Sequence, residues 1–266
     1  MSEEETGTEA VGTPLRDWGT VAEELLERIV IVSPHLDDAV LGCSQLMAAH
    51  PGATVVTVFS GPLEQYPNPM THWDQLAGFV PGDDVLVARR KEDAEALAEL
   101  DARWVWLDYT EHQYLERPQW VQAPAVVDEL EQVIRDLEPT AVFIPFGLAN
   151  PDHDVTHQAA MLVRERFADV PWFCYEDSGY KHIPGMLAWR VSQLFRRGIW
   201  PTPACPRIDP GQERKRAAFA HYTSQILALD HDWAILAKLD TPAPEQYWRL
   251  DPPPEGWGGL LQQGDD

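Results

Sequence analysis

Short runs of β-branched and aromatic residues alternate along this chain with longer stretches that carry apolar residues at helical spacing. The helical stretches include "DVLVARRKEDAEALAELD" and "PAVVDELEQVIRDLEP". Strands separated by helices predict a mostly parallel sheet. We therefore expect an α/β protein with a Rossmann-like, doubly wound sheet and helices on both faces. The expected buried strands are "RIVIV" (28–32), "TVVTVF" (54–59), "WVWL" (104–107), "AVFIP" (141–145) and "WFCY" (172–175).

The ends of the chain and its last third follow this pattern less closely. "LAWRVSQLFRR" has the mixed character of a strand, whereas "GQERKRAAFAHYTSQILAL" is typical of a helix after a Pro-Gly break. Residues 1–18 are acidic and without periodicity, so we expect a disordered segment there. We expect one domain over 19–240 and a Pro/Gly-rich tail over 241–266.

Two polar clusters follow predicted strands. "SPHLDDAVLGC" (33–43) comes after the first strand, and "PFGLANPDHDVTH" (145–157) comes after a later one. In a doubly wound sheet, ligands bind beyond the carboxyl ends of the strands. The two clusters are therefore expected at the same edge, where they can converge.

Together the clusters contain the ligands of a catalytic metal site. Such a zinc takes three protein ligands and leaves a position open, and His35, Asp38 and His153 supply this set. Asp37 is left beside the open position, where it can act as general base toward water. Two histidines and a carboxylate also suit non-haem iron(II), so the residues alone leave Zn²⁺ and Fe²⁺ open.

Each of these residues also has an ordinary structural explanation. Asp38 can cap the following helix, Asp37 can complement its dipole, and His153 and His157 can form local hydrogen bonds. Two His/Asp clusters at the ends of two parallel strands are costly unless they bind something, so together they favour a site.

Charge narrows the range of partners. The chain has 43 acidic and 20 basic residues, a net charge of −23, which argues against binding to nucleic acid. The opening "MSEEETGTEA" does not resemble a secretory signal, and no segment has the length to cross a bilayer. We expect a soluble, cytoplasmic protein with buried free thiols at its three cysteines. A homo-oligomer is compatible with the sequence.

Several segments resemble, in order, the motifs of the PIG-L or LmbE-like zinc-dependent N-deacetylases. "SPHLDDAV" is similar to the family's "(A/S)-H-P-D-D-E", with Leu36 where proline is usual and Ala39 where glutamate is common. The resemblance extends over residues 28–226. The later segments that resemble the family are "RRKEDAEALAEL" (89–100), "NPDH" (150–153), "YEDSGY" (175–180) and "KRAAFAHYTSQ" (215–225).

The resemblance implies a Rossmann-like hydrolase that removes an acetyl group from an N-acetylglucosamine-type amino sugar conjugate, a small-molecule partner. Carried over by position, His35, Asp38 and His153 match the metal ligands and Asp37 the general base. Arg89 matches a residue that contacts substrate in relatives. An ion pair between Arg89 and an acidic residue of the same helix is its ordinary alternative.

One position departs from the family. Asn150 stands where the first histidine of "H-P-D-H" is usual, a residue expected to stabilise the oxyanion or to protonate the departing amine. Asparagine can donate a hydrogen bond but has no titratable proton near neutral pH. We expect Asp37, once protonated, to serve as acid as well as base. The alternatives are that His157, otherwise expected on a helix surface, takes over or that turnover is weak.

Asp108 lies on the same predicted edge, as a candidate ligand of sugar hydroxyls or an ordinary turn residue. The leading hypothesis is thus metal-dependent N-deacetylation. A sugar-binding homologue that keeps the metal without turnover is the main alternative. An iron oxygenase and a dinucleotide enzyme are disfavoured, the latter because the turn after the first strand carries carboxylates in place of a glycine-rich phosphate cradle.

Overall fold

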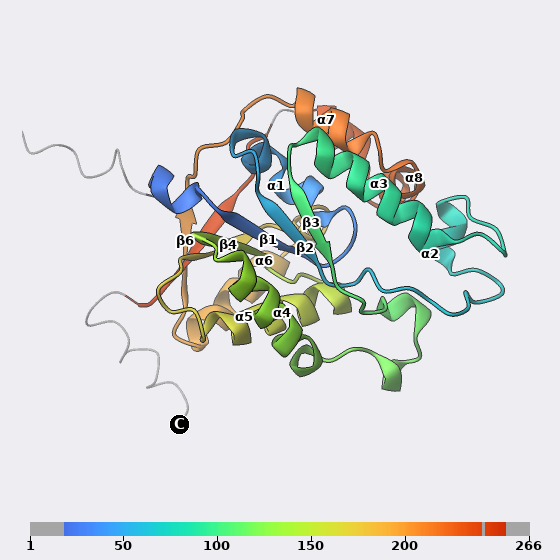
Figure 1. Cartoon of the computed structure of the whole chain (residues 1–266), viewed down its shortest axis with the longest axis horizontal. Helices are drawn as coiled ribbons and strands as arrows, with labels where there is room; N and C mark the ends of the chain where they lie inside the picture. Colours follow the sequence, from blue (N-terminus) through green and yellow to red (C-terminus); the bar gives the residue numbers. More distant parts are fainter. Residues whose placement is uncertain (1–18, 241–242, 254–266) are drawn as a thin grey trace, which may run out of the picture.

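The structure is a computed structural model that describes residues 19–240 and 243–253. These residues form a seven-stranded sheet with helices on both sides (Figure 1). The strand order is β3-β2-β1-β4-β5-β7-β6. β7 is antiparallel to both of its neighbours, and the other pairs are parallel. The predicted fold class is confirmed. The strands are β1 (Ile29–Ser33), β2 (Thr54–Thr57), β3 (Arg103–Trp106), β4 (Ala141–Pro145), β5 (Trp172–Tyr175), β6 (Trp200–Ala204) and β7 (Tyr247–Asp251).

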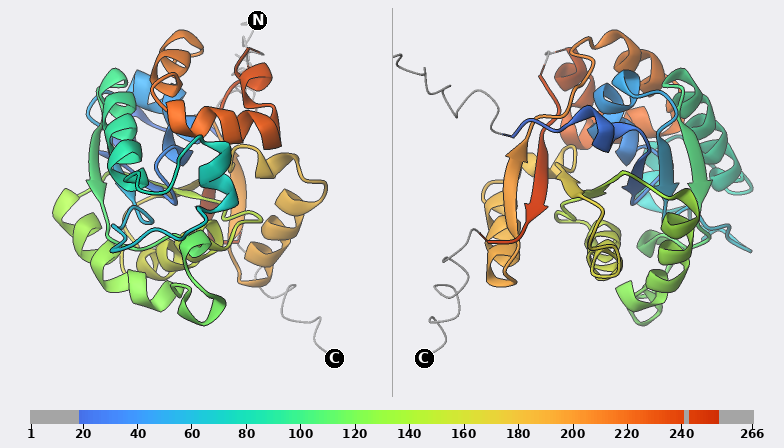
Figure 2. Two further views of the ribbon diagram at one scale, coloured as in Figure 1. Left: turned by 90° about the vertical axis from the view of Figure 1, so that its right-hand side faces the viewer. Right: turned by 60° about the vertical axis from the view of Figure 1, so that its left-hand side comes forward.

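Helices cover both faces of the sheet (Figures 1 and 2). Each face has its own apolar core. Successive strand residues point to opposite faces, so Ile31 of β1 lies in one core and Val30 and Val32 lie in the other. The first core lies under α1 (Asp38–Ala49), α3 (Val85–Glu99) and α7 (Glu213–Phe219), and the second under α4 (Ala123–Leu137), α5 (Pro151–Arg164) and α6 (Met186–Arg196). The other α-helices of the described residues are α2 (His72–Leu76), α8 (Thr223–Trp233) and α9 (Ile235–Asp240).

The strand order reverses direction between β1 and β4. From β1 the chain moves outward to β2 and β3, and it then returns to the other side of β1 with β4 and β5. Loops on either side of such a switch point diverge and leave a crevice beyond the carboxyl ends of the strands. Both predicted polar clusters border this crevice, because α1 follows β1 and α5 follows β4.

Three sequence expectations need correction. "LAWRVSQLFRR" forms α6 and not a strand, because Leu187, Val191 and Leu194 lie on one helical face and pack into the second core. β3 is not buried, because it is an edge strand; Trp104 is 39% exposed. The stretch expected to be one late helix breaks between α7 and α8.

The expected C-terminal tail also differs in its described part. Residues 247–251 form β7, whose Tyr247 and Leu250 are buried between β5 and β6. The run is short and next to prolines, which hid its strand pattern. The expected disordered segment 1–18 and the rest of the expected tail lie outside the described residues. Within the described part, none of the helices has the length and apolarity to span a membrane.

Candidate metal centre

The turn between β1 and α1 brings a histidine and an aspartate together. The backbone N–H of His35 donates to Oδ2 of Asp38 at 3.0 Å. Ser33 Oγ closes the turn, since it donates to the carbonyl of His35 at 2.8 Å and accepts from the N–H of Ala39 at 3.1 Å. Asp38 is the first residue of α1, yet its carboxylate points back over the turn. Asp37, the N-cap residue, makes no capping hydrogen bond through its side chain.

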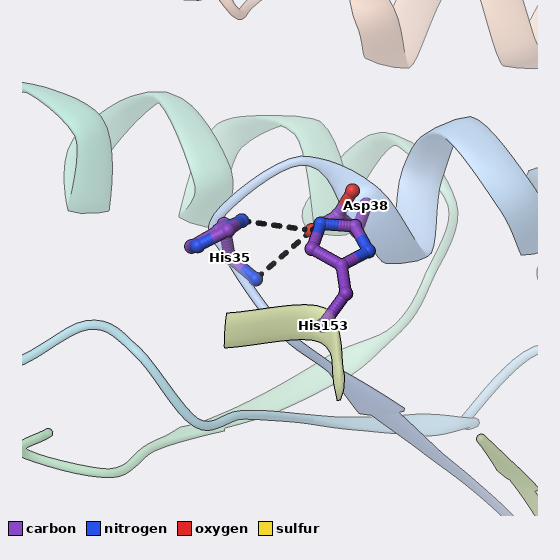
Figure 3. Close-up of side chains that lie close together, drawn as sticks. All are labelled: His35, Asp38 and His153. Carbon is purple, nitrogen blue, oxygen red and sulfur yellow. Dashed lines mark hydrogen bonds and ion pairs between the residues drawn. The ribbon is translucent and has the colours of Figure 1, made fainter. Parts of the chain in front are cut away.

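The third side chain of the site comes from the first turn of α5. Asn150 caps this helix, because its Oδ1 accepts from the N–H of Asp152 at 2.8 Å. His153 then projects toward the turn after β1. Its Nε2 lies 3.2 Å from Asp38 Oδ2, and Nδ1 of His35 lies 3.3 Å from the same oxygen. One ligand atom from each of the three residues lies within 4.8 Å of the other two (Figure 3).

Two outer carboxylates determine which nitrogen of each imidazole faces Asp38. Asp152 Oδ2 lies 3.0 Å from Nε2 of His35, and Asp177 Oδ1 lies 2.6 Å from Nδ1 of His153. Burial raises the pKa of Asp152, but hydrogen bonds from two imidazoles outweigh it and hold this pKa below its usual range. A carboxylate only accepts hydrogen bonds. In their neutral forms, His35 therefore donates from Nε2 and His153 from Nδ1, and the remaining lone pair of each ring faces Asp38.

This donor set fits a divalent metal ion. Two imidazole nitrogens and a carboxylate oxygen suit zinc and also iron(II), so the metal's identity stays open. Burial raises the pKa of Asp38, yet His153 and His35 outweigh it and keep Asp38 ionised. Burial likewise opposes a charge on His153, but Asp38 and Asp177 raise the pKa of His153 to about 9. The site therefore attracts positive charge.

Asp37 lies beside this set with its carboxylate uncommitted. It is 6% exposed, and none of the hydrogen bonds found among the described residues involves its side chain. Burial, followed by repulsion from Asp38, raises the pKa of Asp37 well above its usual range. A carboxylate in this situation is suited to accept a proton.

Two adjoining cavities open at the site. The smaller cavity, of about 390 Å³, is lined by His35, Asp37, Asp38 and His153, among others. The larger cavity, of about 750 Å³, is lined mainly by apolar groups, including two tryptophans. His112 and Asn150 line both cavities, so these two residues lie at the junction.

Asn150 and Tyr180 form a pair at the edge of the smaller cavity. The Asn150 Nδ2 donates to the Tyr180 hydroxyl at 3.3 Å. Burial raises the pKa of Tyr180, so the hydroxyl keeps its proton. Asn150 thus combines two contacts, since its oxygen caps α5 and its nitrogen donates to Tyr180, which also lines the smaller cavity.

The two predicted substrate residues differ in position. Arg89 is buried and lines the smaller cavity, where its Nη2 donates to Asp74 at 2.9 Å and its Nη1 lies 3.7 Å from Glu111. Its partners are thus on other elements and not on its own helix. Asp108 is largely exposed, pairs with Arg90 at 2.7 Å and lines neither cavity. The structure does not bring Asp108 to the site.

His157 is not the surface residue that we expected. It is fully buried in α5, with Nδ1 donating to the carbonyl of Pro145 at 2.9 Å, and it lines neither cavity. Burial, helped by Arg190, lowers the pKa of His157 to about 3. A neutral core histidine of this kind cannot take over a proton-transfer role at the cavity.

Sequence reasoning overlooked four polar residues around the site. Asp152 and Asp177 lie inside the segments "NPDH" and "YEDSGY", which resemble family motifs, but these motifs assigned no role to either aspartate. Tyr180 ends the second of these segments. His112, in a 3₁₀ turn after β3, belongs to no pattern that we recognised.

Comparison with known proteins places the chain in a family. Residues 30–163 match the family described as PIG-L, GlcNAc-PI de-N-acetylase. None of the curated proteins matches the chain. Among solved structures, the zinc-inhibited form of teicoplanin deacetylase is 22% identical over 86% of this chain and 100% of that chain, with a TM-score of 0.69.

Two further structures share the fold. The N,N'-diacetylchitobiose deacetylase of Pyrococcus horikoshii is 16% identical over 84% of each chain, with a TM-score of 0.52. The 4-carboxy-2-hydroxymuconate hydratase of Pseudomonas putida is 17% identical over 85% of this chain and 97% of that chain, with a TM-score of 0.53. At these identities the likeness establishes the fold and not the reaction. The family match covers just over half of the chain and includes His35, Asp38 and His153, so the protein belongs to the PIG-L family.

Proposed function

We propose that this protein is a metal-dependent hydrolase that removes the acetyl group from an N-acetylglucosamine-type amino sugar conjugate. The observation that carries the proposal is the convergence of His35 Nδ1, Asp38 Oδ2 and His153 Nε2 in a cavity that also holds Asp37. Membership of the PIG-L family supports the reaction, and deacetylases among the similar structures are consistent with it. Location in the cytoplasm stays a prediction from the sequence.

His35, Asp38 and His153 would hold the metal, with zinc as the first choice and iron(II) as the second. A bound ion would polarise the amide carbonyl and lower the pKa of water. Asp37 would accept the proton of the attacking water, because its carboxylate is buried, uncommitted and raised in pKa.

Asn150 and Tyr180 would stabilise the negative oxygen that develops on the amide carbonyl. The Nδ2 group of Asn150 has two hydrogens, and Tyr180 takes one of them. The Tyr180 hydroxyl accepts this bond, so its own hydrogen remains available to donate. Two such donors at the cavity edge suit an oxyanion. Asn150 would thus keep the oxyanion role of the usual histidine without its titratable proton.

Arg89 would contact the sugar. Its guanidinium borders the smaller cavity and is fixed by Asp74 and Tyr114, with Nη1 donating to the Tyr114 hydroxyl at 3.3 Å. A guanidinium held in this way orients hydroxyl groups with little loss of side-chain freedom. The contribution of Arg89 is therefore expected mainly in KM.

The test combines metal analysis with acetate release from a panel of N-acetylglucosamine conjugates. Wild-type protein should contain zinc or iron and should release acetate, and a chelator should abolish the release. Asp37→Asn should keep its metal but lose activity by about 10²- to 10⁴-fold, the usual contribution of a general base. Mass spectrometry of the native protein measures the metal.

Asp128→Asn is the matched control, because Asp128 is an exposed carboxylate on α4. It should leave metal content and acetate release unchanged. Activity that persists in Asp37→Asn would refute the assignment of the base. Metal-free wild-type protein whose thermal stability does not respond to added zinc or iron would refute the metal centre itself.

A sugar-binding protein without turnover is the alternative, and Asn150 is the observation that favours it. Asn150 cannot titrate, and its oxygen is committed to the cap of α5. Binding of the conjugates without any metal-dependent acetate release would select this alternative.

A further inference from the structure

His112 is a histidine at the junction of the two cavities that no role assigned so far uses. It begins the 3₁₀ turn His112–Tyr114 after β3, and its side chain is 26% exposed. Its ring stands edge-on to Trp120, with centroids 5.3 Å apart. Its chain segment is held to α5 by Asp152, which accepts the backbone N–H of His112 at 3.1 Å.

The same carboxylate orients the imidazole. Nδ1 of His112 lies 2.8 Å from Asp152 Oδ2, the oxygen that also accepts from His35. Because this oxygen also accepts the backbone N–H of His112 and the ring N–H of His35, it acts as an acceptor toward Nδ1 of His112, which donates. Nε2 is therefore the ring nitrogen that Asp152 does not hold. Among the described residues, none forms a hydrogen bond with this atom.

Cleavage of an amide needs a proton on the departing nitrogen, because an amine anion is too basic to leave in water. Three other groups in the smaller cavity, two histidines and an asparagine, are poorly placed to supply it. His35 and His153 each have one nitrogen on an outer carboxylate and the other toward Asp38. Asn150 has no titratable proton. His112 is an imidazole oriented by a carboxylate with a free second nitrogen, which is the usual arrangement of a general acid.

On the basis of the proposed deacetylation, we propose that His112 is the catalytic acid that protonates the departing amine, in place of the dual role that we expected for Asp37. Water adds to the carbonyl carbon and its proton passes to Asp37. The carbonyl then re-forms while the C–N bond breaks and its electron pair takes the proton from Nε2 of His112. Asp37 loses its proton to solvent and His112 regains one, so acetate and the free amine are the net products.

This assignment also divides the substrate between the cavities. The acetyl group lies with the metal ligands in the smaller cavity, and the nitrogen lies at the junction, next to His112. The remainder of the conjugate can then extend into the larger cavity.

The decisive variant is His112→Asn. The asparagine amide can occupy the place of Nδ1–H and donate to Asp152, whereas nothing replaces Nε2. We use 4-nitrophenyl N-acetyl-β-glucosaminide as the amide probe and 4-nitrophenyl acetate as a probe whose leaving group needs no proton. His112→Asn should lower kcat for metal-dependent deacetylation about 10²-fold or more. Metal-dependent hydrolysis of the ester should change by less than about threefold, and metal content should stay the same.

A purely structural His112 predicts a different result. If His112 only positions Asp152, then His112→Asn keeps the amide activity, and that outcome overturns the proposal. Equal losses on the amide and the ester also overturn it, since they indicate a damaged centre. Asp37→Asn should lose both activities. His221→Asn, a histidine beside Glu95 that lines neither cavity, is the matched control and should change neither.

A wild type that deacetylates no conjugate in the panel is a failure of the proposed function, and a second measurement then decides the proposal. Diethylpyrocarbonate modifies accessible imidazoles, and the sites are identified by mass spectrometry of the digested, metal-loaded protein. His112 should react faster than His35 or His153, and N-acetylglucosamine, which has no amine that consumes the reagent, should slow its reaction while leaving the exposed His231 unaffected. Reaction of His112 at an unchanged rate in N-acetylglucosamine would overturn the proposal.

Discussion

Two buried polar clusters adjoin α1, one at its first residue and one farther along the helix, and they satisfy their charges in different ways. The first is the metal centre of His35, Asp38 and His153. The second, the Glu245 cluster, is built around a carboxylate that Lys215 contacts at 2.7 Å. In the Glu245 cluster, the carboxylate oxygens of Glu245 accept hydrogen bonds from groups of the chain itself. These donors are Lys215 Nζ, the hydroxyls of Ser44 and Tyr247, and the backbone N–H groups of Gln45 and Leu46.

This difference indicates which of the two clusters is suited to bind a ligand. Lys215 supplies a positive charge from the chain itself, so Glu245 does not require a ligand. At the metal centre, acceptor lone pairs converge and the positive charge must come from outside, as a proton or as a metal ion. The pKa of His153, raised to about 9 by Asp38 and Asp177 against the effect of burial, reflects this need. A buried charge network is thus a functional candidate when its acceptors outnumber its own donors.

Removal of Lys215 should have the largest effect on stability. Lys215→Met leaves Glu245 buried without its cation, and breaking such a pair costs about 3–5 kcal/mol of unfolding free energy. Metal affinity per folded molecule should not change. Urea unfolding and metal titration measure the two quantities.

Two variants sharpen this test. In Lys215→Met/Glu245→Gln the charge that was left unpaired is also removed, so most of the lost stability should return. Lys91→Met removes an exposed lysine 3.9 Å from Glu95 and should cost less than about 1 kcal/mol. A Lys215→Met protein of wild-type stability would break the comparison, because the Glu245 cluster would then not depend on its own cation.

Removal of an outer carboxylate should change the metal affinity more than the stability of the fold. Asp177→Asn preserves the size of the side chain but weakens the hold on Nδ1 of His153, at 2.6 Å. Outer-carboxylate changes of this kind typically weaken metal affinity about 10- to 100-fold. Competition with a chromogenic chelator measures the affinity.

The matched control is Asp93→Asn, which removes a buried carboxylate that accepts from Trp106 and Tyr222, outside the centre. Its metal affinity should equal that of the wild type. If Asp93→Asn weakened metal binding as much as Asp177→Asn, the effect would be a general one of the fold and not of the carboxylate on His153.

The sheet and the three converging side chains were predictable from the sequence for a common reason. Apolar runs that alternate with helical stretches specify which strand ends carry a polar turn, and the switch point places the turns after β1 and β4 next to each other. His35, Asp38 and His153 follow from this local information. So does Asp37, as the residue left over in the turn.

The rest of the site depends on contacts between distant segments. His112 and Asp177 follow β3 and β5, and they meet α5 through hydrogen bonds across 40 and 24 positions of sequence, respectively. A single histidine or aspartate in a loop carries no periodicity, so no local pattern marks it. The expectation for Asp108 was wrong for the opposite reason. Asp108 does follow a strand, as the local pattern indicates, but its side chain pairs with Arg90 and does not reach the site.

A last comparison concerns two histidines one turn apart on α5. His153 sits among carboxylates, whereas His157 is buried without one, and the pKa of His157 falls to about 3 through burial and Arg190. The unfolded chain protonates His157 near pH 6.5 but the folded chain does not. Stability is therefore fully present above pH 6.5 and falls by up to about 1.4 kcal/mol per pH unit as the pH drops toward 3.

His157→Asn removes this titration while offering an amide N–H to the carbonyl of Pro145. The difference in unfolding free energy between wild type and variant should then shrink as the pH falls from 6.5 to 4.5, measured by urea unfolding in excess chelator. His153 remains in both proteins, so its opposite dependence cancels in the difference. A difference that stays constant with pH would show that burial does not lower the pKa of His157 in the folded chain.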